Sequence, residues 1–152
     1  MFKIDIKTAQ TMFFDRPAAR RNIDTRTRQV LSWFGAHVRR TAQRSIRRRR
    51  GARGARGARG TSKPGRPPVS HTGLLKKFLW FGYDATRRSV VIGPVRLPRR
   101  GRSGKAPATL EYGGTVTLPD GRKANIEPRP YMGPAFRTGL TRLPYFWNNA
   151  GK

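Results

Sequence analysis

The sequence has no cysteine and few acidic residues, and these two absences exclude much of enzyme chemistry. Without cysteine there are no disulfides, no thiolate nucleophiles and no thiolate metal ligands. The seven acidic residues are Asp5, Asp15, Asp24, Asp84, Glu111, Asp120 and Glu127. No two of them stand at the i, i+3 or i+4 spacing that would bring two carboxylates together on one helix.

The two histidines do not offset this shortage of chemical groups. His37 and His71 have no partner at the short spacing that zinc motifs show. Ser70 precedes His71, but nothing supplies the acid that would orient the imidazole for nucleophilic catalysis. We therefore expect no enzyme activity, no cofactor and no metal site.

Long apolar runs are missing as well. No stretch approaches the ~20 apolar residues of a membrane helix, and residues 1–5 do not begin a secretory signal. We expect a soluble, initially cytoplasmic protein without a membrane partner.

Positive charge is what the sequence has in abundance. Its 34 Lys and Arg residues face seven acids, which gives a formal net charge of +27. The hydrophobic fraction of 36% lies below the roughly 45–50% of a typical globular domain, so we expect a small core. Such an excess of charge attracts polyanions. Nucleic acid is the first candidate partner, and acidic surfaces of neighbouring subunits are the second.

The basic residues are densest between positions 47 and 66, where Gly-Ala-Arg repeats three times at 51–59. This segment has no apolar side chain that could offset its ordering entropy by burial, so residues 47–70 are predicted to be a flexible loop. Counterion release makes it a candidate nucleic-acid-binding segment. A plain solvated loop and contact with acidic protein surfaces are the alternatives. The candidate residues are Arg47, Arg48, Arg49, Arg50, Arg53, Arg56, Arg59, Lys63 and Arg66. Residues 96–107 form a second basic loop.

The first half of the chain predicts a short strand and a long helix. Alternating apolar residues indicate a strand at 2–6. Apolar residues at helical spacing predict an amphipathic helix at 16–48, with Gly35 as its weak point. The apolar positions are Ile23, Val30, Phe34, Val38, Ala42 and Ile46.

The second half predicts short strands and a final helix. Residues 74–81 are either a helical turn that runs into a strand or a buried strand, and 89–93 form a strand. Residues 108–112 form a short helix, and 115–118 with 122–126 form a hairpin around Asp120-Gly121. A C-terminal helix is expected at about 131–148. The whole chain, 1–152, is thus predicted to be a single α+β domain with a small antiparallel sheet.

Three stretches have a more specific character. Residues 64–75 read Pro-Gly-Arg-Pro-Pro-Val-Ser-His-Thr-Gly-Leu-Leu, residues 108–114 read Ala-Thr-Leu-Glu-Tyr-Gly-Gly, and residues 128–136 read Pro-Arg-Pro-Tyr-Met-Gly-Pro-Ala-Phe. In this order they resemble the neck and tail-completion proteins of long-tailed bacteriophages and the related virion-morphogenesis proteins of transposable phages. The likeness covers about 64–140. The three Gly-Ala-Arg repeats and the high charge depart from the usual member.

The resemblance implies a non-catalytic virion protein that forms a homo-oligomeric ring at the head-to-tail junction, with sixfold or twelvefold symmetry. Its partners would be other phage neck, connector and tail proteins, with genomic DNA as a further candidate. Such a protein is assembled in the host cytoplasm. The implied structural motif residues are Thr72, Gly73, Glu111, Gly113, Arg129, Pro130 and Pro134.

The roles expected of these residues are structural. Arg129 and Pro130 would fix the start of the last helix, and Glu111 would pair with such an arginine, within the subunit or across subunits, or lie as a plain surface residue. Thr72-Gly73 would start the element at Leu74, and Gly113-Gly114 would end another.

Two other functions remain open at this point. A basic RNA-binding protein of ribosomal type shares this size, charge and Gly-Ala-Arg composition. A capsid-lining protein that neutralises packaged DNA is the third possibility.

Overall fold

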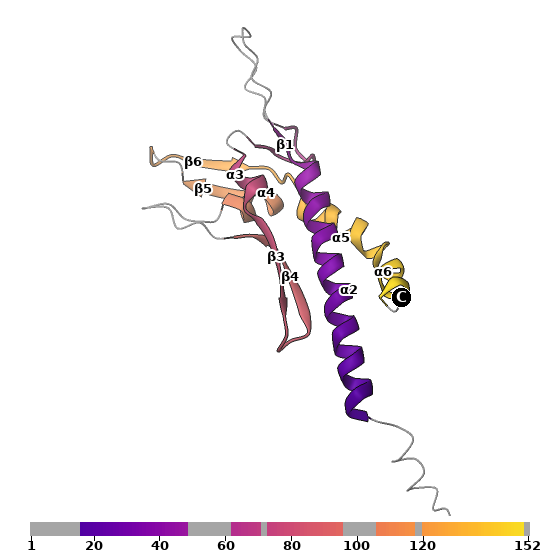
Figure 1. The fold of residues 1–152 in the computed structure, drawn as a ribbon. Helices are drawn as coiled ribbons and strands as arrows, with labels where there is room; N and C mark the ends of the chain where they lie inside the picture. Colours follow the sequence, from indigo (N-terminus) through magenta and orange to yellow (C-terminus); the bar gives the residue numbers. More distant parts are fainter. Residues whose placement is uncertain (1–15, 49–61, 71–72, 96–105, 118–119, 151–152) are drawn as a thin grey trace, which may run out of the picture.

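The computed structural model describes residues 16–48, 62–70, 73–95, 106–117 and 120–150. The predicted strand at 2–6 lies outside these ranges. One long helix, α2 (Arg16–Ser45), dominates the structure, and its N-terminal end projects beyond the other elements (Figure 1). Helices and short strands occur together, which confirms the predicted α+β class.

The core lies along the second half of α2, where apolar side chains recur at intervals of four. The buried stripe consists of Val30, Phe34, Val38, Ala42 and Ile46. Ile23, which the spacing assigns to the same apolar face, is instead 61% exposed. The buried stripe thus begins at Val30 and not at Ile23, because the elements packed on α2 do not cover the Ile23 side chain.

The end of α2 also differs from the prediction. The helix stops at Ser45 and not at 48, because β1 (Arg47–Arg48) pairs in parallel with β2 (Val69–Ser70). Ile46, between the helix and β1, is 1% exposed and fixes this point of the chain in the core.

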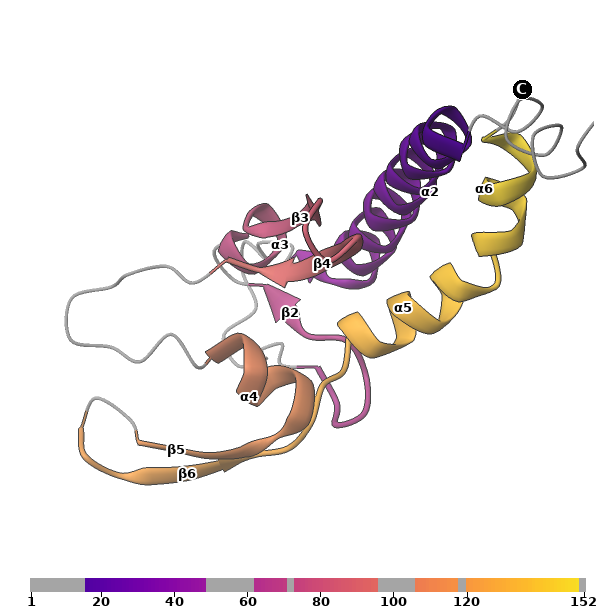
Figure 2. The same ribbon diagram turned by 90° about the horizontal axis from the view of Figure 1, so that it is seen from below.

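Two groups of elements flank α2 on different sides (Figure 2). On one side lies the antiparallel hairpin of β3 (Leu79–Asp84) and β4 (Ser89–Pro94), and on the other lie α5 (Met132–Leu140) and α6 (Leu143–Asn149). The core cluster of Phe34, Val38 and their neighbours fills the space between them.

Glycines set how closely both flanks approach the helix. A Cβ at Gly35 would lie 2.7 Å from Cδ2 of Phe81 and 2.8 Å from Cγ2 of Val90. A Cβ at Gly139 would lie 2.5 Å from Cγ2 of Val38. Gly35 was expected to weaken the helix, yet α2 continues through it, because its missing side chain makes room for the hairpin.

A second, smaller group of elements follows along the chain. It consists of α4 (Ala106–Tyr112) and the antiparallel hairpin of β5 (Gly114–Thr117) and β6 (Lys123–Ile126). The predicted hairpin around Asp120-Gly121 is confirmed, and the antiparallel strands form two separate small sheets where one was expected. The first two residues of α4 fall in the segment predicted as the second basic loop.

Two other predictions about the second half are now resolved. Residues 74–81 form a helical turn, α3 (Leu74–Lys77), that runs into β3, which is the first of the two alternatives. The prediction of a single helix at 131–148 is wrong, because α5 and α6 are separate helices. Pro144 has no N–H to bond the carbonyl of Leu140, so it cannot continue α5, but it fits the first turn of α6.

Candidate nucleic-acid interface and the motif junction

The basic loop begins and ends on a common base. Arg47 is paired with Val69, and Arg48 with Ser70, so the chain that leaves α2 and the chain that returns lie side by side. Arg47, Lys63 and Arg66 are exposed at this base. The structure therefore orders both ends of the predicted 47–70 loop. Its remaining candidates, Arg49, Arg50, Arg53, Arg56 and Arg59, lie outside the described residues.

The returning end of this loop is held by local hydrogen bonds. The N–H of Arg66 donates to the carbonyl of Lys63 at 3.2 Å, around Gly65, whose φ is +73°. The Ser70 side chain is 6% exposed, and its Oγ accepts a hydrogen bond from the N–H of Gly73 at 2.9 Å. Gly73 has a φ of +75° and precedes α3, as predicted; Thr72 lies outside the described residues.

The three motif stretches, together with Ser62 and Lys63 just before the first of them, meet in one place, which we call the motif junction (residues 62–65, 110–113 and 128–133). The N–H of Gly65 donates to the carbonyl of Pro128 at 2.9 Å, and the N–H of Arg129 donates to the carbonyl of Leu110 at 2.6 Å. Nε of Arg129 donates to the carbonyl of Ser62 at 3.0 Å. Segments that are about 20 to 65 positions apart thus share direct hydrogen bonds.

Glu111 is the centre of the motif junction, but its partner is a helix and not an arginine. Its Oε2 accepts hydrogen bonds from the N–H groups of Tyr131 and Met132 at 2.9 and 3.0 Å, and its Oε1 accepts one from Gly133 at 2.7 Å. The next residue, Pro134, has no N–H. One carboxylate therefore satisfies the free donors of the first turn of α5, where negative charge is also favoured.

This finding corrects the expected pairing of Glu111 with an arginine of the same subunit. The sequence contained a signal for the true role, because the start of α5 has no Ser, Thr, Asp or Asn at its cap position, Tyr131, whose side chain makes no cap bond. The free N–H groups of such a helix take acceptors from elsewhere in the chain or from water. Arg129 instead anchors the loop end through Ser62, and Pro130 is half-buried beside it.

Two glycines of the motifs allow this close arrangement. Gly113 has a φ of +78°, and a Cβ there would lie 3.0 Å from both the carbonyl oxygen of Ile126 and Cδ of Pro128. A Cβ at Gly133 would lie 3.2 Å from Oε1 of Glu111. The predicted role of Gly113, ending the element before it, agrees with its place directly after α4.

Tyr131 closes the junction from the core side. It is 1% exposed, and burial together with the nearby Glu111 and Tyr112 raises the pKa of its phenol to about 12. The phenol therefore stays neutral across the physiological range, which suits a packing role.

The described acids and His37 lie apart from one another. Among the described residues, no three potential ligands from His, Asp and Glu gather in one place. His37 lies in the covered half of α2, with its ring 5.8 Å from that of Phe146, and its buried Nε2 has no hydrogen-bond partner in the described structure. Burial and then Arg142, Arg40 and Arg44 lower its pKa.

The remaining described acids are held in turns or exposed. Asp120 pairs with Arg122 at 2.6 Å in the β5–β6 turn, and hydrogen bonds from Arg122 lower its pKa. Asp84 accepts hydrogen bonds from the N–H groups of Thr86 and Arg87 in the β3–β4 turn.

No protein-family model, curated protein or solved structure matches this chain. The likeness to phage neck proteins thus rests on the three motifs alone. What the structure adds to them is that they form one hydrogen-bonded unit. Across the described ranges, every helix is too short or too polar to cross a membrane.

Sequence reasoning missed a set of exposed apolar side chains on the two C-terminal helices. Phe136 is 45% exposed, Leu140 44%, Tyr145 60% and Trp147 46%. Of the other two tryptophans, Trp33 packs near Phe146, with ring centroids 6.5 Å apart, and Trp80 lies under the guanidinium of Arg39 at 5.3 Å. Trp33 thus packs against the C-terminal helices, whereas Trp147 is among their exposed side chains.

Proposed function

We propose that this protein is a structural subunit of the head-to-tail junction of a long-tailed bacteriophage. It forms a neck or tail-completion ring that links the connector to the tail, and it has no catalytic role. Its basic loops contact DNA or acidic neighbouring subunits.

The observation that carries this proposal is the motif junction. The three stretches that resemble the phage family are distant in sequence, yet they bond to one another through Gly65, Glu111 and Arg129. Their common effect is to fix the start of α5, so the family motifs serve to position the C-terminal helices.

Those helices carry the second supporting observation. Phe136, Leu140, Tyr145 and Trp147 are large, apolar and substantially exposed, and aromatic side chains of this kind are enriched in the centres of protein interfaces. A chain with a net charge of +27 and a small core gains stability when neighbours cover such residues.

The sheets provide a third argument for assembly. Within the described ranges each sheet has two strands. The β3–β4 hairpin packs on α2, but the β5–β6 hairpin makes little contact with it, and an isolated two-stranded hairpin is marginally stable in water. Neighbouring subunits in a ring could cover or extend these hairpins through head-to-tail contacts, which close when the rotation between subunits closes.

The test is to determine whether the protein forms rings and enters particles. The full chain should elute as a closed oligomer in light scattering, appear as rings by electron microscopy, and be detected in purified virions. Replacing Tyr145 and Trp147 together with Ser should lower the oligomer mass while circular dichroism stays unchanged. Ile23→Ser is the control, because Ile23 is also exposed but lies on the projecting end of α2.

Three outcomes would point elsewhere. A monomer that is absent from particles would contradict the proposal. Sedimentation with ribosomal subunits would favour the RNA-binding alternative. Hundreds of copies per particle would indicate a capsid lining, because a ring needs few.

A further inference from the structure

The face of α2 that builds the core changes its chemistry at the projecting end. A helix returns to the same angular position after 18 residues, which is about five turns. The buried positions of this face include Phe34, Val38 and Ala42. Eighteen residues earlier the same face carries Arg16, Arg20 and Asp24, and Arg28 lies about one turn beyond Asp24. A stripe that buries apolar groups in one half thus presents guanidinium groups in the other.

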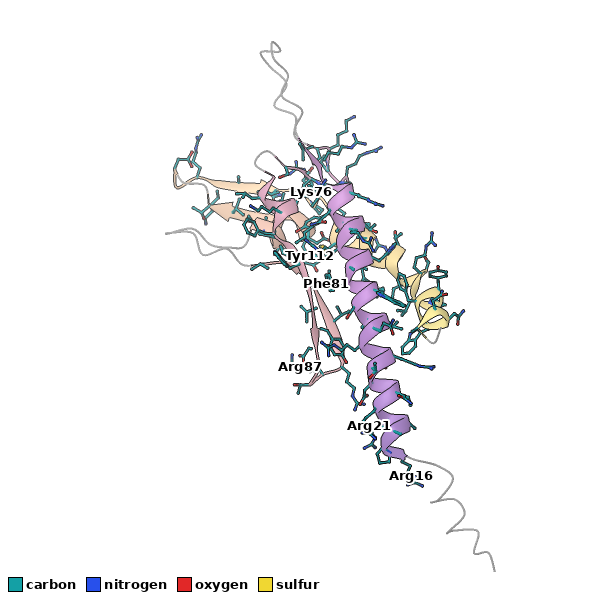
Figure 3. All side chains as sticks on the ribbon, in the orientation of Figure 1. Arg16, Arg21, Lys76, Phe81, Arg87 and Tyr112 are labelled. Atoms are coloured by element: carbon teal, nitrogen blue, oxygen red, sulfur yellow. The ribbon has the colours of Figure 1, made fainter. Side chains whose placement is uncertain are left out.

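The turn between β3 and β4 adds two arginines to this end of the molecule. Asp84 accepts the N–H groups of Thr86 and Arg87, and Arg88 has a φ of +48°, so the turn has a defined shape. Nη2 of Arg88 lies 3.3 Å from Oδ1 of Asp24, which joins the turn to α2. Figure 3 shows Arg87, Arg21 and Arg16 at this same end.

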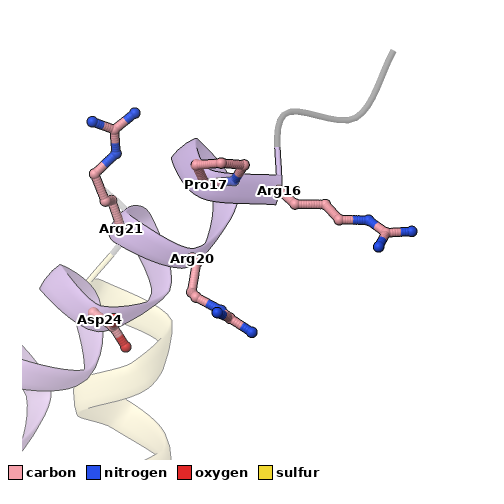
Figure 4. A pocket seen from close by; sticks show the side chains of 5 residues that line it. All are labelled: Arg16, Pro17, Arg20, Arg21 and Asp24. Atoms are coloured by element: carbon pink, nitrogen blue, oxygen red, sulfur yellow. The ribbon is translucent and has the colours of Figure 1, made fainter. Parts of the chain in front are cut away.

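These side chains make one exposed basic patch, which we call the projecting arginine surface. It consists of Arg16, Arg20, Arg21, Arg28, Arg87 and Arg88, all exposed. The one acid among them, Asp24, already pairs with Arg88, so six guanidinium groups and one carboxylate leave a formal charge of +5. Arg16, Pro17, Arg20, Arg21 and Asp24 line a hollow there (Figure 4).

The chemistry of this surface favours nucleic acid over protein. Apart from Ile23, the residues between the arginines are small or polar, including Asn22, Thr25 and Thr27. Protein interfaces have an apolar centre, whereas DNA interfaces are polar and positive and use Arg, Thr, Asn and Gln on phosphates. A second copy of this chain brings the same net charge of +27 and cannot supply the missing negative charge.

We propose that the projecting arginine surface binds the phosphate backbone of DNA, as a second contact separate from the basic loop. Arg47 begins the loop at the opposite end of α2, and a helix of 30 residues spans about 45 Å. The two contacts therefore act independently. The inference rests on the proposed function only in taking DNA as the polyanion, and it does not need ring formation.

The experiment measures binding of the full-length protein to a fluorescent duplex of arbitrary sequence across a range of salt concentrations. The test variant carries Arg20→Gln, Arg21→Gln and Arg28→Gln. The plot of log K against log salt has a negative slope, and each lost phosphate contact makes it less steep by about 0.9. The magnitude of the slope should therefore decrease by about two to three in the test variant. Affinity at 0.1 M salt should fall at least about tenfold.

A matched variant controls for net charge. Arg40→Gln, Lys123→Gln and Arg137→Gln remove the same three charges from exposed positions elsewhere. This control should weaken binding less, and Asp24→Asn should strengthen it, because it removes a carboxylate that repels phosphate. Circular dichroism confirms that α2 is retained in each variant.

The basic loop provides the comparison between the two sites. Arg53→Ser, Arg56→Ser and Arg59→Ser should weaken binding separately, and the losses in log K should add when both triple variants are combined. Binding unchanged by the test variant would overturn the inference and make an acidic protein surface the partner of α2. Equal weakening by test and control variants would also overturn it. Neither result depends on whether rings form, so the proposed function fails or stands by its own test.

Discussion

The two halves of α2 have the same helical geometry but opposite environments. From Val30 onward the helix is covered by the β3–β4 hairpin on one side and by α5 and α6 on the other, and Val30 and Val38 are 0% exposed. From Arg16 to Gln29 the side chains are exposed or half-buried, and Ile23 is 61% exposed. Helical spacing alone does not distinguish these halves.

The difference shows what each half contributes. The covered half carries the stability of the fold, because its side chains leave water. The projecting half gains little from burial and depends on its covalent continuity with the covered half. It is therefore free to carry charge that a core-facing stripe would not tolerate.

The largest expected effect comes from truncating matched apolar residues in the two halves. Phe34 is 4% exposed, and its ring meets that of Phe136 edge-on at 5.6 Å. Phe34→Ala should lower the free energy of unfolding by about 3–5 kcal/mol, because it leaves a cavity. Ile23→Ala should change it by less than about 0.5 kcal/mol. Urea unfolding followed by circular dichroism measures both, and similar losses in the two variants would contradict the comparison.

The next effect tests how the covered half acquires its cover. Glu111→Ala removes the acceptor of three N–H groups at the start of α5 and should destabilise the protein by about 2–4 kcal/mol. The melting temperature should fall by roughly 5–15 °C.

The exposed Glu127 provides the control for loss of an acid. Glu127→Ala should shift the melting temperature by less than about 2 °C, because no core element depends on it. If Glu111→Ala and Glu127→Ala have the same melting temperature, the role given to the Glu111 carboxylate is wrong.

The outline of the fold was predictable because local signals agreed with the tertiary structure. The four-residue spacing from Val30 to Ile46 gives the covered stripe, the β-branched residues at 90–92 give β4, and Asp120-Gly121 gives the β5–β6 turn. Each of these signals depends on neighbours in the sequence. They can therefore be recognised without knowledge of long-range contacts.

What could not be predicted depends on contacts between distant segments. Ile23 lies at helical spacing with the buried stripe, and the position of the hairpin and α5 leaves it exposed while Phe34 is buried. Gly35 weakens an isolated helix, but the approach of Phe81 makes it necessary. The partner of Glu111 lies 20 positions away, in a helix whose missing cap was the one available clue.

The smallest effect concerns pH and again separates the halves, since the covered half contains His37. Burial is the first cause of its lowered pKa, followed by Arg142, Arg40 and Arg44. At pH values around the ordinary histidine pKa of about 6.5, His37 is therefore protonated to a greater extent in the unfolded chain than in the folded one. Stability should rise with pH through this region and fall as the pH drops below it.

His37→Gln should remove that part of the pH dependence, which urea unfolding at a series of pH values between 5 and 8 would measure. Salt separates the two kinds of cause. At 1 M salt the screening length is about 3 Å, so the contribution of the arginines shrinks while that of burial remains. The difference between wild type and His37→Gln should therefore persist at high salt. If the difference disappears at high salt, the arginines and not burial are the main cause of the lowered pKa of His37. The imidazole would then be well hydrated in spite of its packing against Phe146.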